Sequence, residues 1–185
     1  MERVQMKTKS AVVCYCLMGA KNNSEKVSTL LGWCQETFEN AGYRELSQGF
    51  VVGRKIPVAM DFCKYPFGFR AQVDESEYYN SYVENLVLSY GLLSSAISSP
   101  EFAHQRETTD YYLVLLMTDE KYNRDKLFPI IKVFEKLKEQ CNLSVCALLV
   151  NGKSYYDAAG TFGDFIECNN KEALGFQLLC AKEGM

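Results

Sequence analysis

The chain has 185 residues, of which 48% are hydrophobic and 23% charged, with 12 Gly and 4 Pro. This composition excludes a disordered, collagen-like or proline-rich protein, and the length suits one domain that spans residues 1–185. Lys and Arg number 20 against 23 Asp and Glu, a net charge of -3, so no basic excess predicts binding to nucleic acid or to an anionic membrane. We therefore expect another protein as the partner.

The hydrophobic segments argue against membrane insertion. The longest apolar runs, 111–117 and 145–150, are much shorter than the roughly 20 residues that a membrane-spanning helix needs. No cleavage pattern of a signal peptide accompanies the first apolar run, 11–17. These features predict a cytoplasmic protein with no direct membrane insertion.

The 8 cysteines are scattered through the chain rather than arranged as a framework. Cys14, Cys16 and Cys146 lie inside apolar runs, which is typical of reduced thiols that serve as small hydrophobic residues. No Cys-x-x-Cys pair occurs and His104 is the only histidine, so we predict neither a structural zinc site nor a cofactor.

The first half of the chain predicts a strand, a helix and a hairpin. Residues 11–17 are continuously apolar, as in a strand buried on both faces, and the polar residues 21–24 can cap a helix. Gly42 suits the left-handed position after that helix. The runs 49–52 and 58–62 predict an antiparallel hairpin. The helix has apolar residues at helical spacing: Val27, Leu30, Leu31, Cys34 and Phe38.

The second half predicts alternating helices and strands. An apolar stripe from Tyr79 to Ile97 indicates a helix that ends at 98–100, and the very apolar run 111–117 suits the centre of a sheet. A helix begins at Asp125, with Pro129 in its first turn. Strands at 143–150 and 164–167 and a helix from 170 to about 182 follow. The helix after Asp125 is expected to bury Leu127, Phe128, Ile131, Phe134, Leu137 and Cys141.

This alternation predicts an α/β fold, with a doubly wound and mostly parallel sheet, one antiparallel edge strand and helices on both faces. No repeat or linker divides the chain, which agrees with a single domain.

Several segments resemble a von Willebrand factor A domain. Residues 111–119 form a hydrophobic strand that ends in Thr-Asp, and residues 143–152 form a later strand that ends near Gly. Residues 49–57 (GFVVGRKIP), 83–90 (VENLVLSY) and 99–103 (SPEFA) are similar to motifs of the copine branch of that family. The resemblance covers roughly residues 11–169 and implies a von Willebrand factor A-like fold.

Members of this family bind Mg²⁺ through an Asp-x-Ser/Thr-x-Ser motif that follows the first strand, a Thr from a middle loop and the Asp of Thr-Asp-Gly. The resemblance places Cys16, Met18 and Ala20 at the three positions of the first motif. None of these side chains carries the oxygen atom that a hard cation prefers. The resemblance therefore implies a degenerate metal site.

The remaining ligand positions are only partly kept. Asp119 matches the Asp of Thr-Asp-Gly, whereas Glu120 replaces the Gly. In place of the Thr, the middle loop offers Glu101 or the serines Ser98 and Ser99. One matching carboxylate with such helpers is expected to bind no divalent cation tightly.

We therefore expect a non-catalytic interaction module or adaptor, without cofactor or metal, that binds another protein through loops at the carboxyl edge of its sheet. The residues predicted to contact the partner are Met18, Lys21, Asn22, Glu101, Phe102, His104, Asp119, Glu120 and Tyr122.

Two alternatives stay open at this point. One is a metal-dependent ligand-binding A domain that keeps a weak divalent site on Asp119. The other is a small thiol-dependent or nucleotide-handling enzyme. It would use His104, but no cysteine accompanies this residue, and the segment 18–24 lacks the spacing of a phosphate-binding loop.

Overall fold

A computed structural model describes residues 9–18, 24–43, 45–52, 58–63, 82–100, 108–117, 124–149, 165–167 and 171–180. Its strands are β1 (Ser10–Met18), β2 (Glu45–Val52), β3 (Val58–Cys63), β4 (Thr109–Met117), β5 (Leu143–Leu149) and β6 (Phe165–Glu167). Its helices are α1 (Ser24–Asn40), α3 (Tyr82–Ser98), α5 (Arg124–Gln140) and α7 (Lys171–Cys180). In the part of the chain so described, no helix has the length and apolar character needed to cross a membrane.

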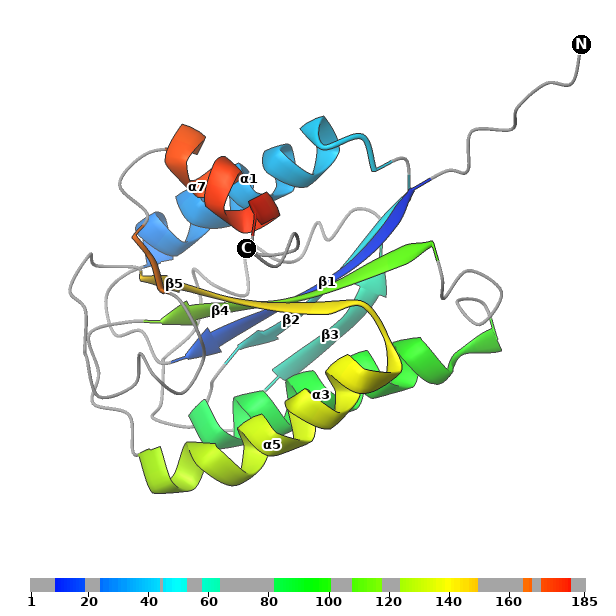
Figure 1. The fold of residues 1–185 in the computed structure, drawn as a ribbon. Helices are drawn as coiled ribbons and strands as arrows, with labels where there is room; N and C mark the ends of the chain where they lie inside the picture. The colour runs from blue at the N-terminus through cyan, green and yellow to red at the C-terminus, as the bar shows by residue number, and fades with distance from the viewer. Residues whose placement is uncertain are drawn as a thin grey trace, which may run out of the picture.

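These strands form one sheet in the order β3-β2-β1-β4-β5-β6 (Figure 1). Neighbouring strands from β2 to β6 run parallel, and β3 pairs antiparallel with β2 at one edge. Helices α1 and α7 cover one face, and α3 and α5 cover the other. The predicted doubly wound α/β fold is confirmed.

The sheet divides the core into two layers because successive side chains of a strand point to opposite faces. The residues of β1 at positions 11, 13, 15 and 17 pack toward α1 and α7, and those at 12, 14, 16 and 18 pack toward α3 and α5. Both β1 and β4 are buried along their whole length, as their continuous apolar runs predict.

Two details of α5 differ from the sequence prediction. Phe128 was expected in the core but is 49% exposed, where the Nζ atom of Lys132 lies 4.5 Å from the centre of its ring. Pro129 was expected in the first turn, but α5 begins at Arg124 and Pro129 lies one turn further in. A proline has no N–H to donate within a helix, and the exposed position of Pro129 limits the cost of that loss.

Strand β2 begins four positions before the predicted residue 49, at Glu45. The first residues of β2 alternate between exposed Glu45, buried Leu46 and half-buried Ser47. This short polar and apolar alternation does not stand out in the sequence. Pairing with β1 along Ser10–Cys16 extends the strand there.

Gly42 ends α1 in the left-handed conformation that the sequence predicts, with φ of 83°. Its N–H donates to the carbonyl of Glu39. A side chain in this conformation is strained, so we expect Gly42→Ala to lower the free energy of unfolding by about 1 kcal/mol.

Gly32 is the matched control, because it lies exposed inside α1 and a Cβ atom there would meet nothing within 4 Å. Gly32→Ala should raise stability by about 0.5–1 kcal/mol through helix propensity. Urea unfolding of both variants measures the opposite signs, and equal effects would contradict the proposed role of Gly42.

Candidate functional site

The carboxyl edge of the parallel sheet is the place where doubly wound folds bind ligands. Strand β1 ends at Met18, which pairs in register with Met117 at the end of β4. Met117 pairs in turn with Leu149 at the end of β5. The three ends therefore lie side by side, at the left of Figure 1.

Four sulfur-containing side chains lie on one face of the sheet at this edge. Cys14, Cys16 and Met18 alternate along β1 and therefore share the face toward α3, and Met117 of β4 lies on the same face. All four are at most 1% exposed. The thiol of Cys16 lies 3.7 Å from the Sδ atom of Met18. We refer to these four residues as the sulfur cluster.

Helix α3 places two polar residues against β1 beside the sulfur cluster. The Nδ2 atom of Asn85 donates to the carbonyl of Leu17 at 2.6 Å, and the Oδ1 atom of Asn85 is buried without a hydrogen-bond partner. One turn later, the Ser89 hydroxyl donates to the carbonyl of Asn85 at 2.8 Å and lies within hydrogen-bonding reach of the Cys14 and Cys16 thiols. A buried amide oxygen without a hydrogen-bond partner makes this layer unusual for a core.

Burial makes these thiols poor nucleophiles. It raises the pKa of Cys16 to about 12 and places that of Cys14 well above the usual range, with the nearby Cys16 as a second cause. On the opposite face, burial also raises the pKa of Cys146 to about 12. Since the thiolate is the reactive form, none of these thiols is activated at neutral pH.

The sulfur cluster does not fit a hard cation. Cys16 and Met18 occupy two of the positions at which the family resemblance expects oxygen ligands, and both present buried sulfur. Across the ranges described above, no group of three or more His, Cys, Asp and Glu side chains could hold a metal ion. Ala20 and Asp119 lie outside those ranges.

Met18 is the one predicted partner-binding residue that the structure describes. It is fully buried, so its side chain faces the core layer under α3 and presents no surface to a partner. The other predicted contacts lie outside the described residues: Lys21, Asn22, Glu101, Phe102, His104, Asp119, Glu120 and Tyr122.

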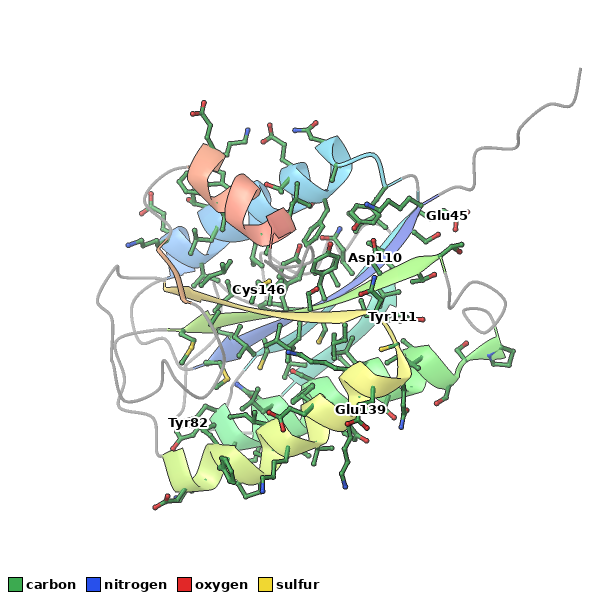
Figure 2. The ribbon with its side chains drawn as sticks, viewed as in Figure 1. Glu45, Tyr82, Asp110, Tyr111, Glu139 and Cys146 are labelled. Atoms are coloured by element: carbon green, nitrogen blue, oxygen red, sulfur yellow. The ribbon has the colours of Figure 1, made fainter. Side chains whose placement is uncertain are left out.

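The described residues on either side of the predicted contacts do not all lie at the same edge of the sheet. Asn85, early in α3, bonds to the end of β1, so α3 starts at the carboxyl edge and runs back toward the start of β4. Figure 2 shows Tyr82, the first residue of α3, at the left and away from Asp110. The described ends of the connection from α3 to β4, Pro100 and Thr108, therefore lie toward the amino edge, opposite Met18.

A polar network around the buried Asp110, which sequence reasoning missed, lies at this amino edge (Figure 2). The carboxylate of Asp110 accepts hydrogen bonds from the Tyr43 hydroxyl at 2.7 Å and from the Asn142 amide at 2.8 Å. Lys9 lies 3.8 Å from the same carboxylate and 4.6 Å from the centre of the Tyr43 ring. The hydroxyls of Tyr43 and Tyr112 are 2.9 Å apart.

This Asp110 network holds together segments that are distant in sequence. Burial is the main reason that the pKa of Tyr112 rises to about 12. Burial, together with the hydrogen bond to Asp110, holds the pKa of Tyr43 far above its usual range. Asp110 directly precedes the predicted strand 111–117, and no pattern in the sequence marks it as buried. These contacts give Asp110 a structural role, because they join the start of β4 to Lys9 before β1, to Tyr43 after α1 and to Asn142 before β5.

Comparisons with known proteins give similarity of fold alone. No family model matches the chain, and no curated protein matches its sequence. Among solved structures, the chain is similar to an aerotolerance-related membrane protein from Bacteroides fragilis that carries multiple mutations to serine. The two are 9% identical with a TM-score of 0.56, and the match covers 95% of this chain and 100% of the other. Together with the strand order, this likeness supports the expected von Willebrand factor A-like fold.

Proposed function

We propose that the chain is a non-catalytic protein-interaction module, or adaptor, of the von Willebrand factor A type in which the hard-cation site has been lost. The observation that carries this proposal is the burial of sulfur at Cys16 and Met18, where Mg²⁺-binding relatives need oxygen. We also propose that the chain derives from the copine branch of this family, to which the motifs at residues 49–57, 83–90 and 99–103 are similar.

Loss of the ion changes how such a domain can bind. A Mg²⁺ ion bridges the domain to a carboxylate of its ligand, and one matching carboxylate at Asp119 cannot hold the ion against water. Without the ion, affinity must come from shape, apolar contact and complementary charge. A partner would therefore be recognised by a surface rather than by a single acidic residue.

The surface that we propose is centred on the loops after β1 and β4, because these strands end side by side at Met18 and Met117. The segment after β1 carries Lys21 and Asn22. The segment after β4 carries Asp119, Glu120 and Tyr122. Opposite charges on adjacent loops suit a partner with a matching charge pattern. Glu101, Phe102 and His104 stay among the predicted contacts, and their own positions lie outside the described residues.

The inert thiols support a non-catalytic role. The cysteines at positions 14, 16, 34 and 146 are buried, so they lack the exposure that thiol catalysis needs. At positions 14, 16 and 146 burial also raises the pKa of the thiol, whereas catalysis needs a lowered pKa. We propose a protein partner in the cytoplasm and one interaction domain over residues 1–185.

Calorimetric titration with Mg²⁺ and with Mn²⁺ tests the loss of the hard-cation site. We expect no saturable binding tighter than about 1 mM for the full chain. Saturable binding below that concentration that disappears in Asp119→Ala would overturn the proposal in favour of a working A-domain metal site.

Capture of partners from the native cell tests the proposed surface. Charge reversal by Lys21→Glu and Glu120→Lys should remove the captured partner, whereas Glu139→Lys, on the exposed side of α5, should retain it. Equal capture by all of these variants would exclude the two loops as the binding surface.

A further inference from the structure

We infer that the sulfur cluster is a site for a soft monovalent cation, Cu(I), with Cys16, Met18 and Met117 as its ligands. The inference rests on the described core and does not depend on which partner the loops bind. It concerns the same edge of the sheet, where sulfur has replaced the oxygen ligands of a hard-cation site.

The spacing of the Cys16 and Met18 sulfur atoms is suitable for one shared ion. Two sulfurs bound tetrahedrally to a metal at about 2.3 Å lie about 3.7–3.8 Å apart. The Sγ atom of Cys16 and the Sδ atom of Met18 are 3.7 Å apart. Met117 supplies a third sulfur from the adjacent strand, at the register position of Met18 and on the same face.

The ligand types select the ion. Thioether and thiolate sulfur are soft ligands that favour Cu(I), whereas Mg²⁺ and Ca²⁺ need oxygen and zinc sites use thiolate, imidazole or carboxylate. One cysteine and two methionines therefore select a soft monovalent ion.

Charge also favours this set of ligands in a dry layer. When Cu(I) binds, a Cu–S bond forms at Cys16, the S–H bond breaks and its proton passes to solvent, while the thioethers of Met18 and Met117 add no charge. The oxidation state of copper does not change. One thiolate and one monovalent cation give a neutral complex, which avoids the cost of a net buried charge.

A second, independent observation concerns a buried polar atom in the same layer that has no hydrogen-bond partner. Asn85 is fully buried, with its Nδ2 atom on the Leu17 carbonyl next to Met18, and its Oδ1 atom has no partner. Ser89 lies one turn away and reaches the Cys16 thiol. The Ser89 hydroxyl would orient the Cys16 thiolate that binds the cation, and the unpaired oxygen of Asn85 belongs to the same layer.

Anaerobic titration of the full chain with Cu(I), in competition with the chromophoric chelator bicinchoninate, tests the site. Accessible thiols are first alkylated with iodoacetamide under native conditions, because the buried thiols of the cluster are protected. We expect one equivalent of Cu(I) to bind and to raise the melting temperature, since the ion binds only the folded chain. Copper-edge X-ray absorption should show a shell of sulfur ligands.

Variants separate the cluster from other thiols. Met18→Leu keeps the shape of the core, so it should fold and should weaken Cu(I) binding by about tenfold or more, and Cys16→Ala by about 100-fold or more. Cys146→Ala is the matched control, because Cys146 is equally buried on the opposite face of the sheet, and it should bind as wild type does. No binding after alkylation, wild-type affinity in Met18→Leu, or equal loss in Cys146→Ala would each overturn the inference.

Discussion

Replacing Asp110 by Ala should lower the free energy of unfolding by about 3 kcal/mol, because two hydrogen bonds to a charged acceptor are lost and each contributes about 1.5–3 kcal/mol. The Asp110 side chain is 8% exposed, so water replaces little of what is lost. The Tyr43 hydroxyl keeps Tyr112 as a neighbour, which places the effect near the lower end of the summed range.

Chemical denaturation of a graded set of variants measures this effect. Asp110→Asn keeps one acceptor oxygen and should cost less than Asp110→Ala, and Tyr43→Phe should cost about 1 kcal/mol. Glu139→Ala, on the exposed side of α5, should change stability by less than about 0.5 kcal/mol. If Asp110→Ala behaved like Glu139→Ala, the network would contribute nothing and the account of the amino edge would be wrong.

Raising the pH from 8 to 11 should lower stability by several kcal/mol because of groups buried in their neutral form. Cys146 has an ordinary pKa of 9.0 and a folded pKa of about 12, and Tyr112 changes from 10.0 to about 12. The unfolded chain therefore loses these protons first as the pH rises, and the folded state binds more protons. Stability from these groups is complete below pH 9 and falls through the interval up to about 12.

The slope is about 1.4 kcal/mol per pH unit for each group within its interval. Cys146 accordingly contributes a loss of about 3 kcal/mol by pH 11, and Tyr112 about 1.4 kcal/mol more. Urea unfolding at pH 8, 9, 10 and 11 measures the total. The comparison with Cys146→Ala isolates one thiol, since the variant should lose stability less steeply above pH 9. Parallel curves for wild type and variant would refute the assignment.

Much of the fold could be predicted because the apolar patterns are continuous. Residues 11–17 and 111–117 have no polar position, and only a central parallel strand buries both faces, so β1 and β4 followed from the sequence. Gly42 could be placed at the end of α1 because few other residues adopt a left-handed conformation. The reading of cysteines as core residues also holds for positions 14, 16, 34 and 146.

Other features depend on contacts between distant segments. Phe128 fits the apolar period of α5. The face of α5 that packs on the core is narrower than the set of apolar residues in the helix, so the ring of Phe128 stays exposed. Tyr43 and Asp110 are 67 positions apart, and no local pattern predicts their bond. Nothing in the sequence distinguishes Asn85 from an exposed polar residue of a helix. Only the packing of α3 on β1 brings its amide to the carbonyl of Leu17.

The apolar periodicity of the chain is sufficient to predict the α/β class and most of the buried residues, and residues 16 and 18 carry sulfur instead of oxygen in any fold. Contacts between distant segments set the polar pairs: they bring Asp110 together with Tyr43, Asn142 and Lys9, and they leave the buried Oδ1 atom of Asn85 without a hydrogen-bond partner. The physical reason is that hydrophobic burial follows local periodicity, whereas a hydrogen bond in the core depends on the separation of two atoms that different strands and helices supply.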